Sequence, residues 1–426
     1  MNRLKHNKAL PSWHILPISA KSKESLTKAT EQLAEQLAHI STSSFVDYVH
    51  SLQTDIQEFR LRRIAVCRDP VHATEVLKTL GKLLSGTGEA DILGRSIGFL
   101  FSGQGTQYAN MCHGLYESEP VFKKVIDKCA SVISDSVDIN LIEYLLTDNV
   151  NANARNINKT SIAQPVLYAV ECGLALLWKH YGINPEVLIG HSIGEFSAAY
   201  VSGVFTLEEG ARIVSARGKY MQQMPAGTML AVLLPEEDVK LLINGEVEIA
   251  VVNGPALTVV SGSKKDIANL ESTLQKKGIQ SRQLHTSHAF HSKMMEDAKG
   301  MFVDEIKKYT FKKPSIPFVS NVTGDWITPE QAIDPNYWGN HLRSTVRFGA
   351  GLETLCANKN LILLEVGPGN TLTSISRQQS ERVKSMPAIN SVRHSKEKCD
   401  DQAYFMRAFG MIWTYGGDVD FQLFYE

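Results

Sequence analysis

The feature that most constrains the fold of this chain is the segment 187–200 of its 426 residues. Residues 187–190 are apolar and indicate a buried strand, and apolar side chains recur at helical spacing after Ser192. Between strand and helix lies Gly190-His191-Ser192-Ile193-Gly194, the G-x-S-x-G sequence typical of a nucleophile elbow. Glycines tolerate the crowded backbone of such a turn, and the serine hydroxyl projects beside a helix N-terminus whose N–H groups can stabilise an oxyanion. The segment predicts an α/β fold with a catalytic serine. The alternative interpretation is a glycine-flanked turn that serves packing alone.

The composition, 43% hydrophobic and 21% charged residues, is typical of a globular protein, and the length predicts two or three domains. The formal net charge of -1 gives no electrostatic basis for binding nucleic acid or an anionic membrane. The first residues lack the apolar core of a signal peptide, and we expect no apolar run long enough to span a bilayer. The six cysteines form no C-x-x-C pair, which predicts no metal site, no disulfide framework and a reduced, cytoplasmic location.

The N-terminal region, residues 12–95, is predicted to be a small α/β scaffold without a functional site. The glycines of Ser85-Gly86-Thr87-Gly88 indicate a flexible boundary near its end. Its predicted strands cover 15–19 and 63–67, and its predicted helices cover 26–37, 45–52 and 73–84.

A strand at 97–101 runs into the glycine-rich turn Ser102-Gly103-Gln104-Gly105-Thr106-Gln107. After a parallel strand, such a turn lies at the carboxyl edge of the sheet, where open α/β folds bind ligands. It is no phosphate loop, because the Gly-Lys-Ser/Thr of that motif is missing, and a tight polar turn is its alternative. Strands at 316–320 and 361–366, the second followed by Gly367-Pro368-Gly369-Asn370, favour a parallel sheet. Helices are predicted between these strands at 162–181 and, after a capping box, at 206–224.

Residues 228–287 follow the order β-α-β-β-α-β, which indicates an inserted ferredoxin-like subdomain. The fold prediction is therefore an α/β protein with a parallel-sheet, hydrolase-like large domain, this insert and a small N-terminal α/β unit. The insert's predicted strands cover 229–234, 247–252, 257–261 and 279–284, and its helices cover 235–243 and 267–274.

A serine nucleophile requires a neighbouring base at neutral pH, and three histidines are candidates. His191 adjoins Ser192, but adjacent residues of an elbow point in different directions, which favours a supporting role. His288 and His291 follow the insert, where the returning chain would form the second wall of a cleft. Packing in the core or at the surface is the alternative for each of them.

Arg217 indicates which kind of acyl group the site would bind. It lies on the helix after the elbow helix, next to the apolar residues Ile213 and Val214. A guanidinium that faces the serine would bind a carboxylate bidentately, which suits an acyl group with its own carboxylate, such as malonyl. The alternative is an ordinary surface arginine.

Five short sequences occur in one order along the chain: Gly103-Gln104-Gly105-Thr106-Gln107, Gly190-His191-Ser192-Ile193-Gly194-Glu195, Arg217-Gly218, His288-Ala289-Phe290-His291-Ser292 and Glu365-Val366-Gly367-Pro368-Gly369. Together they resemble the acyltransferase domains of modular polyketide synthases and, more distantly, the bacterial malonyl-CoA:acyl carrier protein transacylase. The resemblance covers residues 96 to about 395. Residues 12–95 resemble the linker that precedes such a domain after a ketosynthase, and the tail 406–425 resembles the segment that wraps back afterwards.

The resemblance implies that Ser192 is the acylated nucleophile, His291 its base and Arg217 the group that binds the acyl carboxylate. The backbone N–H groups of Gln104 and Ile193 would form the oxyanion hole. Acyl-CoA would load Ser192, and the phosphopantetheine thiol of an acyl carrier protein would then accept the acyl group, with no bound cofactor or metal. Polyketide synthase modules, and a ketosynthase through the linker unit, are the implied partners.

The sequence from His288 to His291 also indicates which acyl group is preferred. In the resembled family, enzymes that prefer malonyl have His-Ala-Phe-His here and enzymes that prefer methylmalonyl have Tyr-Ala-Ser-His. Phe290 would crowd the space beside the α-carbon, and Ile193 stands where methylmalonyl enzymes have glutamine. We expect malonyl to be favoured over methylmalonyl by roughly 10–200-fold. The alternative is a carrier-bound hydroxy- or aminomalonyl unit, to which His288 could donate a hydrogen bond.

The predicted organisation is 1–95 for the linker unit, 96–227 and 288–395 for the large subdomain, 228–287 for the insert and 396–426 for the tail. The chain begins at Met1 and contains no ketosynthase or carrier protein, so we expect a free-standing enzyme that acts in trans in polyketide antibiotic biosynthesis, with an excised domain as the alternative. A serine hydrolase or thioesterase is less favoured, because no acid is placed to pair with His291 and no Asp-Gly dipeptide occurs. A non-catalytic docking module would not need Ser192, His291 and Arg217 together.

Overall fold

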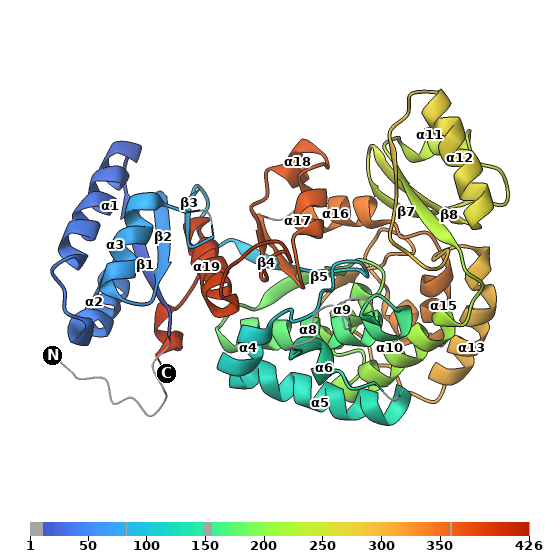
Figure 1. The fold of residues 1–426 in the computed structure, drawn as a ribbon, viewed down its shortest axis with the longest axis horizontal. Coiled ribbons are helices and arrows are strands. Elements are labelled where there is room, and N and C mark those ends of the chain that lie inside the picture. The colour runs from blue at the N-terminus through green and yellow to red at the C-terminus, as the bar shows by residue number, and fades with distance from the viewer. Residues whose placement is uncertain (1–11, 82, 138, 148–155, 358–359, 426) are drawn as a thin grey trace.

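The computed structural model describes residues 12–81, 83–137, 139–147, 156–357 and 360–425. Residues 1–11 of the predicted linker unit and Glu426 of the predicted tail lie outside this part. The chain forms three sheets in a row (Figure 1): the N-terminal sheet at one end, a central sheet in the middle and the sheet of the insert at the other end.

The central sheet is parallel and has the strand order β10-β5-β4-β11-β12, which confirms the predicted fold class. Phe101 of β4 pairs with Gly190 of β5 on one side and with Val366 of β11 on the other, so three strands end at the same level. The loops that follow them therefore meet at one edge of the sheet. The strands are β4 (Ser96–Phe101), β5 (Pro185–Gly190), β10 (Phe318–Val319), β11 (Leu361–Val366) and β12 (Ala388–Asn390).

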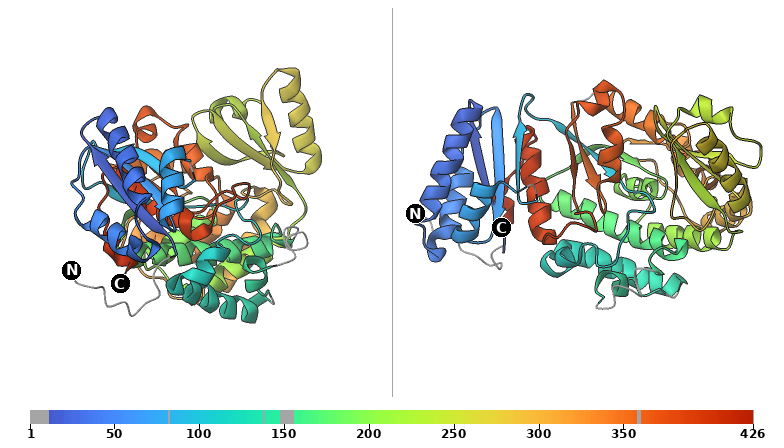
Figure 2. Two further views of the ribbon diagram at one scale, coloured as in Figure 1. Left: turned by 60° about the vertical axis from the view of Figure 1, so that its left-hand side comes forward. Right: turned by 45° about the horizontal axis from the view of Figure 1, so that its top comes forward.

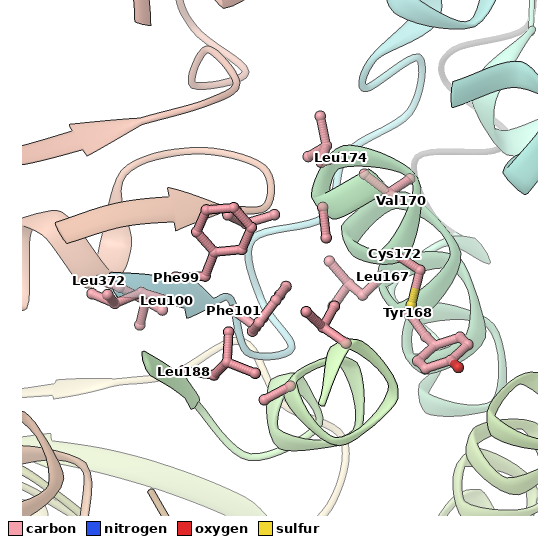
Figure 3. Close-up of a cluster of buried hydrophobic side chains, with 14 of the residues drawn as sticks. Phe99, Leu100, Phe101, Leu167, Tyr168, Val170, Cys172, Leu174, Leu188 and Leu372 are labelled. Carbon is pink, nitrogen blue, oxygen red and sulfur yellow. The ribbon is translucent and has the colours of Figure 1, made fainter. Parts of the chain in front are cut away.

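Helix α8 (Thr160–His180) packs its apolar side chains against this sheet. Figure 3 shows Leu167 and Leu174 of α8 in the same buried cluster as Phe99 and Phe101 of β4. By length and composition alone α8 could span a membrane, so the expectation of no such apolar run was wrong. Its most apolar window is 89% buried inside the protein, because it is the core helix between the sheet and helices α5 (Pro120–Val137) and α10 (Leu207–Gln222).

The other helices of the large domain cover both faces of the central sheet (Figure 1). Thr206 and Glu209 form the predicted capping box at the start of α10, with each side chain bound to the other's backbone N–H. The bounds are α4 (His113–Ser118), α5 (Pro120–Val137), α6 (Ile142–Leu145), α9 (Gly194–Val201), α10 (Leu207–Gln222), α13 (Glu296–Ile306), α14 (Pro329–Ile333), α15 (Pro335–Arg343), α16 (Phe348–Cys356), α17 (Thr371–Ser376) and α18 (Glu381–Lys384), with a 3-10 turn at Lys293–Met295.

The insert is a four-stranded antiparallel sheet with the order β7-β8-β6-β9, flanked by two helices. This is the ferredoxin-like arrangement that the element order predicts, and Figure 2 shows it standing apart from the central sheet. Its elements are β6 (Thr228–Val232), α11 (Glu236–Lys240), β7 (Glu248–Gly254), β8 (Leu257–Gly262), α12 (Lys264–Lys276) and β9 (Ser281–Gln283).

The N-terminal unit has one strand more than the sequence indicated. The predicted flexible boundary at 85–88 is strand β3 (Ser85–Glu89), which pairs antiparallel with β2, and the preceding helix ends at Thr79 because Leu80 adopts a left-handed conformation. The glycines of β3 serve close packing rather than flexibility, because a Cβ on Gly86 would lie 2.0 Å from the sulfur of Met411 and a Cβ on Gly88 would lie 2.5 Å from the hydroxyl of Thr414. The other elements are β1 (His14–Ala20), α1 (Lys23–Leu37), α2 (Thr42–Thr54), β2 (Leu61–Cys67) and α3 (Pro70–Thr79).

The C-terminal helix α19 (Asp401–Thr414) returns to this unit and lies between it and the large domain (Figure 1). Arg62 of β2 donates a hydrogen bond of 2.9 Å to the carbonyl of Trp413 and stacks on its ring at 4.8 Å. A 3-10 turn, Phe421–Phe424, follows α19. The helix therefore ties the N-terminal unit to the central sheet.

Candidate active site

Ser192 occupies the strained turn between β5 and α9. Its φ is 50°, in the left-handed region, and both flanking glycines are sterically required. A Cβ on Gly190 would lie 2.1 Å from the backbone of Gly194 and of Glu195, and a Cβ on Gly194 would lie 2.3 Å from the carbonyl of Phe101. This is the geometry of the predicted elbow, with the serine at the carboxyl edge of the central sheet.

His291 lies within hydrogen-bonding distance of the serine, although 99 residues separate them along the chain. Its Nε2 is 2.8 Å from Ser192 Oγ, and its Nδ1 is 2.9 Å from the carbonyl oxygen of Ser344. Because a carbonyl only accepts, Nδ1 carries the proton, and Nε2 of the neutral ring is free to accept from the serine. Burial, and next the charge of Arg217, hold the pKa of His291 well below its usual value, which keeps the ring neutral at pH 7.

Arg217 reaches the same hydroxyl from α10. Its Nη2 is 3.4 Å from Ser192 Oγ, its side chain is fully buried, and the guanidinium lies 5.4 Å from the ring centre of Phe196. Burial lowers its pKa to about 9 and the charge of Glu195 opposes this shift, so the group stays cationic at neutral pH. Its Nε is buried and has no hydrogen-bond partner in the described chain. This is a buried cation with an unused donor next to the serine.

Asn321, at the end of β10, holds the elbow. Its Oδ1 accepts the backbone N–H of Ser192 at 2.7 Å, and its Nδ2 donates to the carbonyl of Gly190 at 2.7 Å. The backbone N–H of Asn321 in turn donates to Oε2 of Glu195 at 2.6 Å. Glu195 is fully buried, also accepts from the hydroxyl of Tyr337, and lies 3.4 Å from Nε2 of His341.

The two backbone N–H groups that are predicted to form the oxyanion hole have no other partner in the part of the chain that the structure describes. Within the described chain, neither the N–H of Ile193 nor that of Gln104 takes part in a hydrogen bond. The Gln104 side chain is fixed to α8, because it donates to Thr160 Oγ1 and accepts from Gln164 Nε2, each at 3.3 Å. Their role as oxyanion donors stays a prediction.

The remaining predicted residues lie around this centre. The ring of His191 is oriented by Oδ1 of Asn253, 2.9 Å from Nε2. His288 and Phe290 are buried and stack on each other, with ring centres 5.9 Å apart. In the described structure neither of these two rings forms a hydrogen bond with Ser192. Their role in selecting the acyl group therefore also stays a prediction.

A pair of buried carboxyl groups, those of Glu171 and Glu365, lies near the carboxyl ends of β4 and β11. Glu365, at the end of β11, accepts the backbone N–H groups of Leu372 and Thr373, and the hydroxyl of Ser102 at 3.4 Å. Glu171 of α8 accepts the hydroxyl of Ser197 at 2.6 Å. Burial raises the pKa of Glu365 to about 7 and that of Glu171 well above its usual value.

Several residues of the site were not singled out in the sequence. Asn321 follows a predicted strand, and the rule that polar residues at the carboxyl ends of parallel strands meet could have found it. Ser344 acts through its backbone carbonyl, for which side-chain identity carries no signal. His341 and Tyr337 lie on the short helix α15, whose place beneath the elbow depends on the tertiary fold.

Comparison with known proteins agrees with this architecture. Residues 98–417 match the family model of the acyl transferase domain, so the chain belongs to the acyl transferase domain family. Residues 14–77 match a model described as CurL-like, polyketide synthase C-terminal. The resemblance to acyltransferase domains of modular polyketide synthases is thereby confirmed.

The individual relatives are a polyketide synthase and two acyl transferase domains of known structure. The chain is 32% identical over 418 residues to a phenolphthiocerol/phthiocerol polyketide synthase of Mycobacterium tuberculosis, covering 95% of this chain but only 28% of that protein. The acyl transferase domain of ZmaA is 33% identical with a TM-score of 0.86, and the alignment covers 97% of each chain. The acyl transferase domain of SpnD, solved in complex with 2-(pent-4-yn-1-yl)malonyl, is 28% identical with a TM-score of 0.88, over 96% of this chain and 98% of that one.

Proposed function

We propose that this acyltransferase moves a malonyl-type unit from coenzyme A, through an ester on Ser192, to the phosphopantetheine thiol of an acyl carrier protein in polyketide biosynthesis. The observation that carries the proposal is the convergence of His291 Nε2 and Arg217 Nη2 on Ser192 Oγ, at 2.8 and 3.4 Å. One group accepts the proton of the nucleophile, and the other is a buried cation that suits a carboxylate.

In the first half-reaction, Ser192 Oγ attacks the thioester carbonyl while its proton passes to Nε2 of His291. The backbone N–H groups of Gln104 and Ile193 would stabilise the oxyanion, in line with their lack of other partners in the described chain. Collapse breaks the C–S bond, and the imidazolium returns the proton to the leaving thiolate. The carbonyl of Ser344 supports that imidazolium by accepting from Nδ1.

In the second half-reaction, His291 takes the proton of the phosphopantetheine thiol, and the thiolate attacks the serine ester. The C–O bond breaks, and the proton returns to Ser192 Oγ. No cofactor takes part, because CoA and the carrier arm are themselves substrates.

The malonyl carboxylate would accept hydrogen bonds from the Nε–H and Nη N–H groups of Arg217, whose guanidinium is cationic and desolvated. A malonyl-type group in the complex of the SpnD domain supports this class of substrate. Polyketide synthase modules are the proposed partners, with the N-terminal unit as the part that faces a ketosynthase. Action in trans and a cytoplasmic location stay predictions.

The test is the intact mass of the protein after incubation with malonyl-CoA, followed by addition of a phosphopantetheinylated carrier protein. One malonyl mass should appear and then move to the carrier. Ser192→Ala should carry no adduct, while the control Ser385→Ala, at an exposed serine, should load normally. His291→Ala should load ~10²–10⁴-fold more slowly. An adduct that persists in Ser192→Ala overturns the assignment, and loading only from a carrier-bound hydroxy- or aminomalonyl donor would replace CoA by that donor.

A further inference from the structure

Strand β7 is an edge strand of the insert's sheet, and its open side is occupied by the large domain. The N–H of Val346 donates to the carbonyl of Ala250, and the N–H of Val252 donates to the carbonyl of Val346, both at 2.9 Å. The hydroxyl of Thr345 donates to the carbonyl of Ile249 at 2.6 Å. Residues 345–346 therefore extend the insert's sheet in parallel with β7.

This junction leads directly to His291. Ser344, which precedes the paired residues, supplies the carbonyl that accepts from Nδ1 of His291. The ring orientation that aims Nε2 at Ser192 thus depends on a segment anchored to β7.

The same strand also holds His191, the residue before the nucleophile, through Asn253. Oδ1 of Asn253 is 2.9 Å from Nε2 of His191, and the backbone carbonyl of Asn253 accepts from Gln379 Nε2 at 2.7 Å. The ring of His191 lies against the loop before Gln104, because a Cβ on Gly103 would be 2.7 Å from its Nδ1. Asn253 is therefore linked, through one ring, to the loop proposed to donate to the oxyanion.

We infer that Asn253 is a positioning residue for acyl transfer. By fixing the ring of His191, it holds the loop that carries Gln104 in place relative to His291, the base that is also anchored through β7. The inference rests on the proposed function. The insert then supports two histidines beside Ser192, one through Asn253 and one through the segment that pairs with β7. Asn253 itself touches no reacting atom in this arrangement.

The first experiment measures single-turnover malonyl loading of Asn253→Ala by intact mass, beside Gln283→Ala as control. Gln283 bonds to Thr228 at the opposite edge of the same sheet and contacts neither histidine. A displacement of about 1 Å in such a site costs on the order of 10²-fold, so we expect Asn253→Ala to load between about 10- and 100-fold more slowly, with Gln283→Ala near wild type.

The second experiment records the pH profile of loading for Asn253→Asp, which keeps an acceptor for His191 and adds a negative charge. The carboxylate should raise the pKa of His191, whose other titratable neighbours are His291 and His341. Protonated His191 would disfavour protonation of His291, so the acid-side decline in the loading rate should move to lower pH than in the wild type. Loss of packing alone would slow loading without moving this decline.

A wild-type rate in Asn253→Ala, or an Asn253→Asp profile whose acid-side decline coincides with that of the wild type, overturns the inference. If Asn253→Ala does not fold, the Asn253→Asp profile alone decides. Failure of the wild-type protein to load malonyl would instead contradict the proposed function, so the two failures are distinguishable.

Discussion

Asn321 binds the backbone of the nucleophile: its Oδ1 accepts the N–H of Ser192 at 2.7 Å. This hydrogen bond removes the serine's own N–H from the donors available to an oxyanion and leaves the N–H of Ile193. It also holds Ser192 at a φ of 50°, a conformation that costs free energy for any residue with a Cβ.

Asn321→Ala should therefore destabilise the protein and slow acyl loading. Two buried groups, the N–H of Ser192 and the carbonyl of Gly190, would lose their partner, and each such loss costs about 1–3 kcal/mol. Urea denaturation should show a fall in the free energy of unfolding of roughly 2–6 kcal/mol. Asn184→Ala is the control and should change neither quantity, because this exposed asparagine donates to the Gly182 carbonyl and has no other side-chain partner among the described residues. Wild-type stability in Asn321→Ala would contradict the clamp.

Arg217→Ala should impair malonyl loading more than acetyl loading, because only malonyl carries a carboxylate for the guanidinium. Loss of a charge-assisted contact costs about 1.5–3 kcal/mol, or roughly 10–150-fold in kcat/KM. The comparison uses malonyl-CoA and acetyl-CoA with mass detection. Arg212→Ala, at an exposed arginine on the same helix, is the control. Equal losses for the two donors would make Arg217 a structural residue.

The pH dependence of kcat/KM for loading should lack the inflection of an ordinary histidine. Burial and the charge of Arg217 hold the pKa of His291 well below 6.5, so the base remains neutral as the pH falls through that value. The rate should thus be flat from pH 8 to 6.5 and decline only below it. A midpoint at or above 6.5 would show that the base is solvated in the free enzyme.

Phe290→Ser should reduce the preference for malonyl over methylmalonyl. Phe290 is buried against His288, and its removal opens space of the size that a methyl group needs. A single methyl discriminates by about 1–3 kcal/mol, so the expected preference of roughly 10–200-fold should fall toward unity. Competition between the two CoA esters, read on the carrier protein, measures it. Phe290→Leu keeps most of the bulk and should retain the preference, whereas an unchanged ratio in Phe290→Ser would place selectivity elsewhere.

Glu365 should make the protein less stable as the pH rises from about 4.5 to about 7. Burial raises its pKa from 4.5 to about 7 in the folded state, so the native protein binds more protons than the unfolded chain across this window. The free energy of unfolding should therefore fall by up to about 3 kcal/mol from this group. Urea denaturation at pH 5 and pH 8 measures the difference.

Glu365→Gln cannot ionise and should reduce this dependence by the part that Glu365 contributes, while the part that comes from Glu171 remains. The variant also loses part of the carboxylate's bonding to Leu372 and Thr373. Glu381→Gln, at an exposed side chain, should leave the wild-type difference intact. The same pH difference in wild type and Glu365→Gln would show that Glu365 does not titrate in this window.

Much of the architecture followed from local patterns in the sequence. The elbow around Ser192 needs glycines at fixed positions, the capping box at Thr206 is a contact between residues three apart, and the β-α-β-β-α-β order of the insert reflects hydrophobic periodicity. These features depend on backbone sterics and on neighbours close in the chain, so sequence alone determines them. A pattern with two physical meanings gave a wrong prediction. The glycines of β3 indicated a flexible boundary, but they permit α19 to approach the strand closely.

The geometry of the site was decided by the tertiary structure. The sequence offered three histidines, and only the return of the chain from the insert puts Nε2 of His291 at 2.8 Å from Ser192 Oγ. The carbonyl of Ser344 and the amide of Asn321 act from segments that reach the elbow through pairing with β7 and through the parallel sheet. A backbone carbonyl has the same chemistry in every residue, and hydrogen bonding depends on distance in space. Such partners are therefore fixed only when the sheets bring remote strand ends to one edge.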